Sequence, residues 1–154
     1  MTKTIESRHL DRTWWILRLT FGLVPIVAGL DKFTNLLTDW TAYLSPTLAS
    51  ALPFSASTFM GIVGVIEIVA GLVVLSRFTR FGGYLVAAWL TCIALNLLAT
   101  HHFDIAVRDL VMATGAYTLA RLTEARAMLG IARPTSDSVP RDTPLPARTA
   151  SILR

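Results

Sequence analysis

The chain has 154 residues, of which 53% are hydrophobic and 16% are charged, and its mean hydropathy is +0.56. A soluble domain of this size needs a polar surface that this composition cannot supply, so a membrane protein is favoured. The net charge of +4 does not indicate nucleic-acid binding, because the basic residues flank apolar runs. Cys92 is the only cysteine in the sequence, which excludes an intramolecular disulfide and a dithiol redox pair.

Four apolar runs predict four membrane-spanning helices. They cover about residues 14–33, 58–76, 81–100 and 103–122, each close to the roughly 20 residues that cross a bilayer as a helix. Short links join the last three runs, so the expected fold is all-α, an integral membrane four-helix up-down bundle. The first link, residues 34–57, is too apolar for a free loop and predicts a short helix in the membrane interface or over the bundle mouth.

The basic residues predict the orientation and the boundaries of the membrane domain. Arg77 and Arg80 lie in the second link, on the same side as residues 1–13 and the segment after residue 123. Under the positive-inside rule this side is cytoplasmic, so both termini are expected in the cytoplasm. Residues 14–123 then form the membrane domain. Residues 124–154 are rich in Pro, Ser, Thr and Arg and are expected to form a disordered tail.

Polar residues from all four runs fall in the outer half of this predicted bundle. Ionisable groups inside a membrane are costly, so they are retained in pairs or for function. One interpretation is structural, with counter-ions such as Glu67 with Arg108 or Asp109 with Lys32. The other is a small polar pocket that binds a quinone head group, an anion or protons. The candidate ligand-binding or proton-relay residues are Lys32, Glu67, Asn96, Asp104, Arg108 and Asp109.

Small residues indicate how the helices pack. Glycines at helical spacing flank Glu67, so this side chain is expected to point at protein and not at lipid. Asp104 and Arg108 are four residues apart and are expected to share a helix face. Arg18, one turn from the cytoplasmic end, is expected to extend to the membrane surface. The candidate packing residues are Gly22, Gly29, Gly64, Gly71 and Gly115.

No metal site is expected. His101 and His102 form the short link between the third and fourth apolar runs, and none of the four runs contains a histidine. A membrane haem usually takes its ligands from two helices, so these two side chains are interpreted as interfacial polar residues.

Three segments carry a recurring pattern of glycines and charges: "LRLTFGLVPIVAGLDKF", "GVIEIVAGLVVL" and "HHFDIAVRDLVMATGAYTLARL". Their order and spacing, over about residues 14–123, resemble the DoxX-like family of small four-helix membrane proteins. The matching positions are Arg18, Gly22, Gly29 and Lys32 in the first helix, Gly64, Glu67 and Gly71 in the second, and Asp104, Arg108 and Asp109 in the fourth.

The resemblance implies a four-helix inner-membrane protein, and some relatives are subunits of quinone-linked redox systems such as thiosulfate:quinone oxidoreductase. We therefore expect an accessory or quinone-interacting subunit, with a quinone as a non-covalent cofactor. Its expected partners are the lipid bilayer and a redox partner protein or further copies of the chain. The alternatives are a scaffold or assembly factor without chemistry and a small-solute or proton transport protein. Whether the chain is an enzyme stays open.

Overall fold

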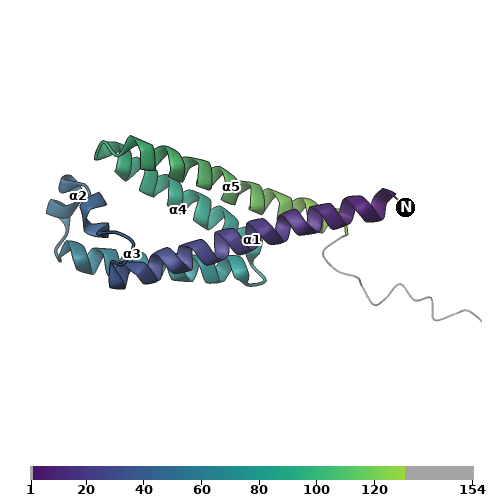
Figure 1. Ribbon diagram of the computed structural model, residues 1–154, viewed down its shortest axis with the longest axis horizontal. Coiled ribbons are helices and arrows are strands. Elements are labelled where there is room, and N and C mark those ends of the chain that lie inside the picture. Colours follow the sequence, from purple (N-terminus) through teal and green to yellow (C-terminus); the bar gives the residue numbers. More distant parts are fainter. Residues whose placement is uncertain (1, 131–154) are drawn as a thin grey trace, which may run out of the picture.

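The computed structural model describes residues 2–130, and their side chains from Arg8 onward. The predicted all-α class is confirmed, because these residues form a helical bundle without strands (Figure 1). The part of the predicted tail from residue 131 lies outside the described residues. In chain order the helices are α1 (Thr2–Thr34), the 3₁₀ helix η1 (Trp40–Tyr43), α2 (Pro46–Ala51), α3 (Ala56–Leu75), α4 (Thr79–Ala99) and α5 (Phe103–Met128).

The first and last helices extend beyond the predicted spans. α1 begins at Thr2 and α5 continues to Met128, because neither extension contains a glycine or proline that would end a helix. The two extensions also bind each other. Arg126 forms an ion pair with Asp11 at 2.5 Å. The indole nitrogen of Trp14 donates to the Thr123 hydroxyl at 2.8 Å. Helix packing therefore continues past the apolar segments.

Within the described part of the chain, three helices are long and apolar enough to cross a membrane: residues 8–34 of α1, α3, and α4. The chain is therefore a multi-pass membrane protein by helix composition. α5 has sufficient length, but charged side chains at both ends limit its uncharged stretch to residues 110–120. A helix of that length rises about 17 Å, against about 30 Å for a hydrocarbon core.

The outward faces of the long helices carry large apolar side chains. Soluble proteins rarely leave contiguous apolar surface of this kind open to water, and contact with lipid accounts for it. The exposed large apolar side chains on α1 and α3 include Leu19, Leu23, Val27 and Leu30 of α1 and Ile62, Val65, Val69 and Leu72 of α3.

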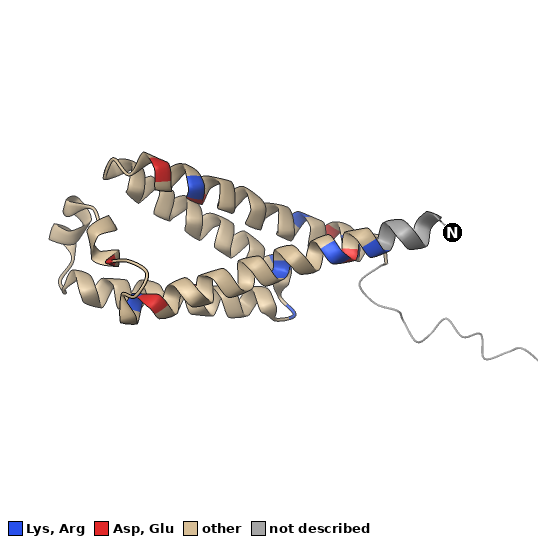
Figure 2. Cartoon of the chain, in the orientation of Figure 1, with Lys and Arg blue, Asp and Glu red and all other residues tan. Residues whose placement is uncertain are grey.

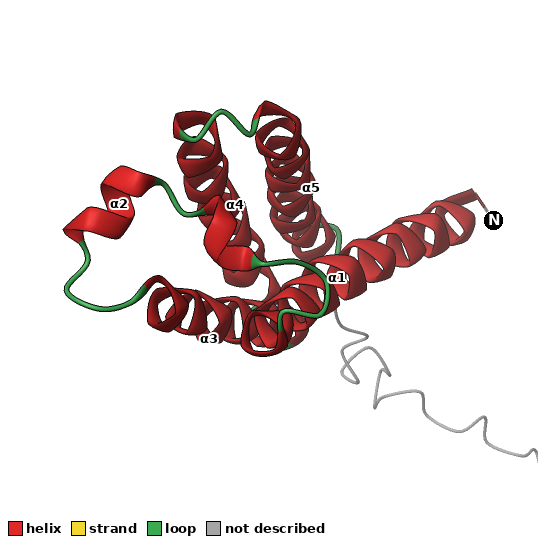
Figure 3. Ribbon diagram, turned by 60° about the vertical axis from the view of Figure 1, so that its left-hand side comes forward, coloured by secondary structure: helices red, strands yellow, loops and turns green. Residues whose placement is uncertain are grey.

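The long helices form two antiparallel pairs, α1 with α3 and α4 with α5 (Figures 1 and 3). The pairs meet at the end where α3 leads into α4 and separate toward the opposite end, where α2 lies (Figure 1). The main apolar core lies where the pairs meet. It is formed by Trp14, Ala70, Val74, Val86, Ala116 and Leu119.

α1 and α3 touch backbone to backbone at two pairs of glycines. A Cβ on Gly29 would lie 2.5 Å from the carbonyl oxygen of Gly64, and a Cβ on Gly64 would lie 2.6 Å from that of Gly29. Gly71 approaches the Gly22 carbonyl in the same way. Gly115 of α5 packs against the ring of Phe21 of α1. Four of the five candidate packing glycines therefore lie in a single helix interface.

The segment between α1 and α3 forms two short helices where one was predicted. Pro46 separates them, because proline lacks a backbone N–H and disfavours a helical conformation in the residue before it. η1 lies across the end where the helix pairs separate (Figure 3). The Asn96 side-chain amide of α4 donates to the carbonyl of Tyr43 at 2.9 Å, and the Tyr43 ring packs on His102. This segment therefore caps the bundle mouth.

Replacing Gly64 tests the close approach of α1 and α3. In Gly64→Ala the new methyl group overlaps the Gly29 carbonyl oxygen, so the variant should lose about 1–3 kcal/mol of stability. Gly61→Ala is the matched control on the same helix, because its Cβ meets only the Phe33 ring at 3.6 Å. Thermal unfolding in detergent compares the two variants. Equal melting temperatures would contradict the backbone contact.

Candidate functional site

The centre of the site is a buried ion pair between α1 and α3. Lys32 Nζ lies 2.6 Å from Glu67 Oε2, and the side chains of Lys32 and Glu67 are only 4% and 8% exposed. Figure 2 shows a basic and an acidic residue side by side on this helix pair, toward the end where the short helices lie. Gly29 and Gly64 lie one turn away on the same helices, so their contact brings the two side chains together. The predicted partners were different, Arg108 for Glu67 and Asp109 for Lys32.

The residues that follow α1 enclose the lysine. The Lys32 ammonium lies 3.9 Å from the centre of the Trp40 ring, which is a cation–π contact. The Trp40 indole nitrogen donates to the neighbouring Asp31 carboxylate at 2.8 Å, and Asp31 also accepts from the backbone N–H groups of Leu36 and Leu37. Asp31 therefore folds the chain back so that Trp40 covers the ion pair.

Sequence reasoning did not find the roles of Asp31 and Trp40. The sequence did contain a pattern that could have indicated these roles. Asp31 lies beside Lys32 at the end of the first apolar run, and Trp40 follows nine positions later. Such an arrangement permits a local turn in which the carboxylate binds free backbone N–H groups.

A second carboxylate reaches the pair from the other helix pair. Asp109 of α5 is buried and is close enough to interact electrostatically with Glu67 and Lys32. The indole nitrogen of Trp89 of α4 is also buried and lies close enough to interact with the Glu67 carboxylate, although the two groups do not have the geometry of a hydrogen bond. The four long helices thus each place one side chain in or near this cluster: Lys32, Glu67, Trp89 and Asp109.

The other predicted site residues lie away from this cluster. The Arg108 side chain is 64% exposed and reaches Asp109 only with Nε at 3.5 Å. Asp104 is exposed, and within residues 8–130 it forms no ion pair with Arg108. Asn96 binds the backbone of η1. Six polar residues were expected to lie together. Three of them, Lys32, Glu67 and Asp109, belong to the cluster, and Trp89 is a further member that was not predicted.

Asp104, Arg108 and Asp109 were all expected to meet the other charges inside the bundle, but of these three only Asp109 lies on the buried face of α5. Small side chains mark it at spacings of three and four: Ala106, Ala113, Ala116 and Ala120. That alanine stripe was visible in the sequence and allows α4 to approach closely, as Gly83 does by packing against Ala116 and Ala120.

Besides Asp31, whose carboxylate is bound by Trp40 and by backbone N–H groups, the site holds two buried carboxylates near one buried ammonium. Lys32 contacts Glu67 directly, whereas the ion pair that Asp109 forms is with the exposed Arg108. Such a group of atoms can hold a proton between the carboxylates or bind a polar ligand that donates to them. Among the described residues, no three His, Cys, Asp or Glu side chains are grouped so as to hold a metal ion.

Arg18 has a defined partner nearer the other end of α1. Its guanidinium donates to the carbonyl oxygens of Leu75 at 2.5 Å and Ser76 at 2.9 Å. These carbonyls lie at the C-terminus of α3, where the last turn of a helix lacks backbone partners. Arg18 therefore satisfies the end of α3 and joins it to α1.

The comparisons with known proteins bear on this cluster. The DoxX family model matches residues 13–102, which is more than half of the chain. The matched range includes Lys32, Glu67 and Trp89 and ends before α5, which carries Asp109. Comparison with curated proteins and with solved structures finds no match.

Removing one partner of the buried pair should leave the other charge uncompensated. Lys32→Met and Glu67→Met should each destabilise the protein by about 3 kcal/mol, and the double variant should recover much of that loss. Asp104→Asn is the control, because Asp104 is exposed and forms no ion pair among the described residues. Thermal unfolding of the four variants measures the coupling. Additive effects of the two single changes would contradict a direct pair.

Proposed function

The chain belongs to the DoxX family, and from this premise we propose that it is an accessory subunit of a membrane redox system that binds a quinone head group. The proposed binding residues are Lys32, Glu67, Trp89 and Asp109. The observation that carries the proposal is their unequal charge and unused hydrogen-bonding capacity inside the bundle.

The unused polar atoms fit a quinone in both redox states. A buried N–H without a partner costs about 1–3 kcal/mol, so a ligand that accepts from Trp89 gains that energy. The carbonyl oxygens of a quinone are acceptors, while the hydroxyl groups of a quinol are donors. Trp89 and Lys32 therefore suit the oxidised form, and the oxygens of Glu67 and Asp109 suit the reduced form.

The carboxylates have a second role in this proposal. Reduction of a quinone takes up two electrons and two protons, and a buried carboxyl group can supply one of them only if it is protonated beforehand. Asp109 is the better candidate, because the contact with Lys32 favours the ionised form of Glu67. The electrons come from a partner protein, so the proposal includes such a partner.

The proposal also requires that α5 crosses the membrane. α5 packs against α4, and its charged Asp109 faces protein and not lipid. Arg108, although exposed, lies near the start of α5, where a long side chain reaches the interface. With α5 as a fourth span, both termini lie on the arginine-rich side, which is cytoplasmic for a protein of the inner membrane.

A scaffold without chemistry is the second candidate. The direct contact between Lys32 and Glu67 favours it, because a complete ion pair between α1 and α3 fixes their register without a ligand. In that case Asp109 and Trp89 are polar residues that the bundle tolerates.

Thermal stability with a short-chain quinone separates the two candidates. At ten times its dissociation constant a ligand stabilises the folded state by about 1.4 kcal/mol, so the melting temperature of the wild type should rise by several degrees. Trp89→Phe and Asp109→Asn should reduce that rise. Trp15→Phe is the matched control, because Trp15 is a half-exposed tryptophan of α1 outside the cluster. No rise in the wild type would contradict quinone binding and favour the scaffold.

A further inference from the structure

A groove at the end of the bundle opposite the Lys32–Glu67 pair shares one residue, Tyr84, with a second groove that runs toward the middle of the bundle. The first has a volume of about 420 Å³ and is lined by Arg77, Phe78, Arg80, Phe81 and Tyr84, at the start of α4. The second has a volume of about 450 Å³ and runs between α4 and α5. Its lining is mainly small or apolar and includes Ala87, Ala88, Leu110 and Ala113.

The two grooves form one continuous surface. Along α4 the lining residues recur at spacings of three and four, from Arg80 and Tyr84 to Ala88 and Thr91, so they share one helix face. α5 runs antiparallel to α4 and borders the same face with Leu110 to Tyr117. The surface therefore begins at charged side chains at the end of the bundle and continues toward its middle over apolar ones.

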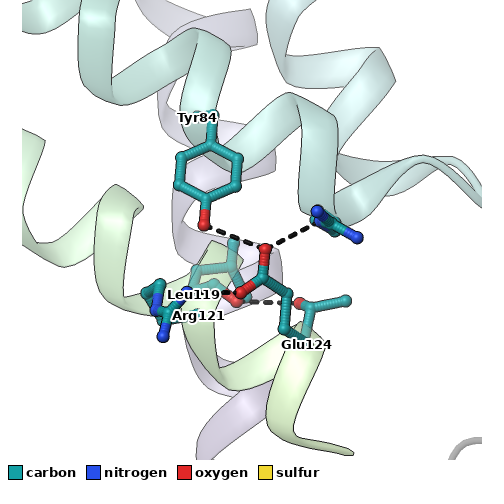
Figure 4. Close-up of polar contacts among 6 residues, drawn as sticks. Tyr84, Leu119, Arg121 and Glu124 are labelled. Carbon is teal, nitrogen blue, oxygen red and sulfur yellow. Dashed lines mark hydrogen bonds and ion pairs between the residues drawn. The ribbon is translucent and has the colours of Figure 1, made fainter. Parts of the chain in front are cut away.

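A nearly buried glutamate holds two arginines in place beside the first groove. Glu124 of α5 accepts from the Tyr84 hydroxyl at 3.0 Å, from Arg80 Nε at 2.8 Å and from a terminal nitrogen of Arg121 at 2.7 Å (Figure 4). Its side chain is 11% exposed, whereas those of Arg80 and Arg121 are 66% and 60% exposed. The guanidinium groups are thus fixed on their inner side and open on their outer side.

The charge of this cluster is not balanced. Arg80 and Arg121 share a single carboxylate, Glu124, and Arg77 lines the adjoining groove, whose lining contains no acidic residue. Each arginine carries five N–H donors, and Glu124 engages only one nitrogen of Arg80 and one of Arg121. The remaining donors form the planar, forked arrangement that binds phosphate oxygens in pairs.

The position of the cluster indicates which phosphate compound fits. The arginines lie where α3 ends and α4 begins, at one end of two membrane-spanning helices, which is the level of lipid head groups. Phe78 and Phe81 beside them are exposed and apolar. We propose that this composite groove binds one anionic phospholipid, with its phosphate on the arginines and an acyl chain along α4 and α5. The positive-inside rule assigns it to the cytoplasmic leaflet.

Native mass spectrometry of the delipidated full chain in detergent tests this proposal. The probes are dioleoyl phosphatidylglycerol and the zwitterionic dioleoyl phosphatidylcholine. One phosphatidylglycerol should bind at concentrations at which phosphatidylcholine does not. Arg77→Gln/Arg80→Gln should weaken that binding on the order of tenfold. Arg77→Gln alone should weaken it in part, and this change leaves the contacts of Glu124 intact. Ala88→Trp, which fills the apolar groove, should weaken it as well.

Arg8→Gln/Arg12→Gln is the matched control, because both arginines are exposed on α1 outside the grooves. This variant should bind phosphatidylglycerol like the wild type, and its melting temperature and those of the groove variants verify folding. Equal binding of the two lipids, equal loss in the control, or no effect of Ala88→Trp would each overturn the composite site. Displacement of phosphatidylglycerol by inorganic phosphate at the same concentration as the lipid would also overturn it. The apolar groove for the acyl chain would then contribute nothing to binding.

Discussion

The buried carboxylate of Glu67 is the constraint on which the rest of the bundle depends. It lies near the middle of α3, on the face that packs against the other helices. A charge at that depth needs a counter-ion, and Lys32 provides one at 2.6 Å. The pair fixes the register of α1 against α3. Because Lys32 lies in the last turn of α1, the pair also determines where the chain leaves the helix and where Asp31 and Trp40 close over it.

The close contact of α1 and α3 allows this pair to form, and Arg18 supports it from the other end. Lysine and glutamate reach each other over a short distance because Gly29 and Gly64 remove the side chains that would separate the helices. At the far end Arg18 donates to the terminal carbonyls of α3. The α1–α3 pair is therefore fixed at both ends. The α4–α5 pair contributes Asp109 and Trp89 to the same polar cluster across the interior.

The features that depend on composition and periodicity could be predicted from the sequence. Apolar runs of about 20 residues specify membrane helices, and the glycines around Glu67 indicate an inward face. The family assignment followed from the order and spacing of these residues, and the match over residues 13–102 confirms it. Features that depend on which of several neighbours is nearest could not be predicted in this way. The ion-pair partner of Glu67 is such a case. Lys32 and Arg108 were both predicted in the outer half of the bundle, so the sequence allowed either of them to pair with Glu67.

Two further differences have local physical causes. Asp104, Arg108 and Asp109 were all expected inside the bundle, but they do not share one helix face, and the alanine stripe beside Asp109 marks the face that is buried. In a membrane protein, close packing of small residues decides which face is inward. The role of Arg18 was missed because its acceptors are backbone carbonyls of a distant helix, which no side-chain pattern marks.

The contact between Lys32 and Glu67, on which the site depends, can be measured directly in lipid bilayers. Solid-state NMR of protein labelled with ¹⁵N at lysine side chains and ¹³C at glutamate side chains reports the dipolar coupling between Lys32 Nζ and Glu67 Cδ. Lys32→Arg and Glu67→Gln samples assign the signal. The Nζ–Oε2 distance of 2.6 Å predicts a strong coupling that both substitutions remove. A sample without that coupling would contradict the account, because the two charges would then be held apart and another group would neutralise Glu67.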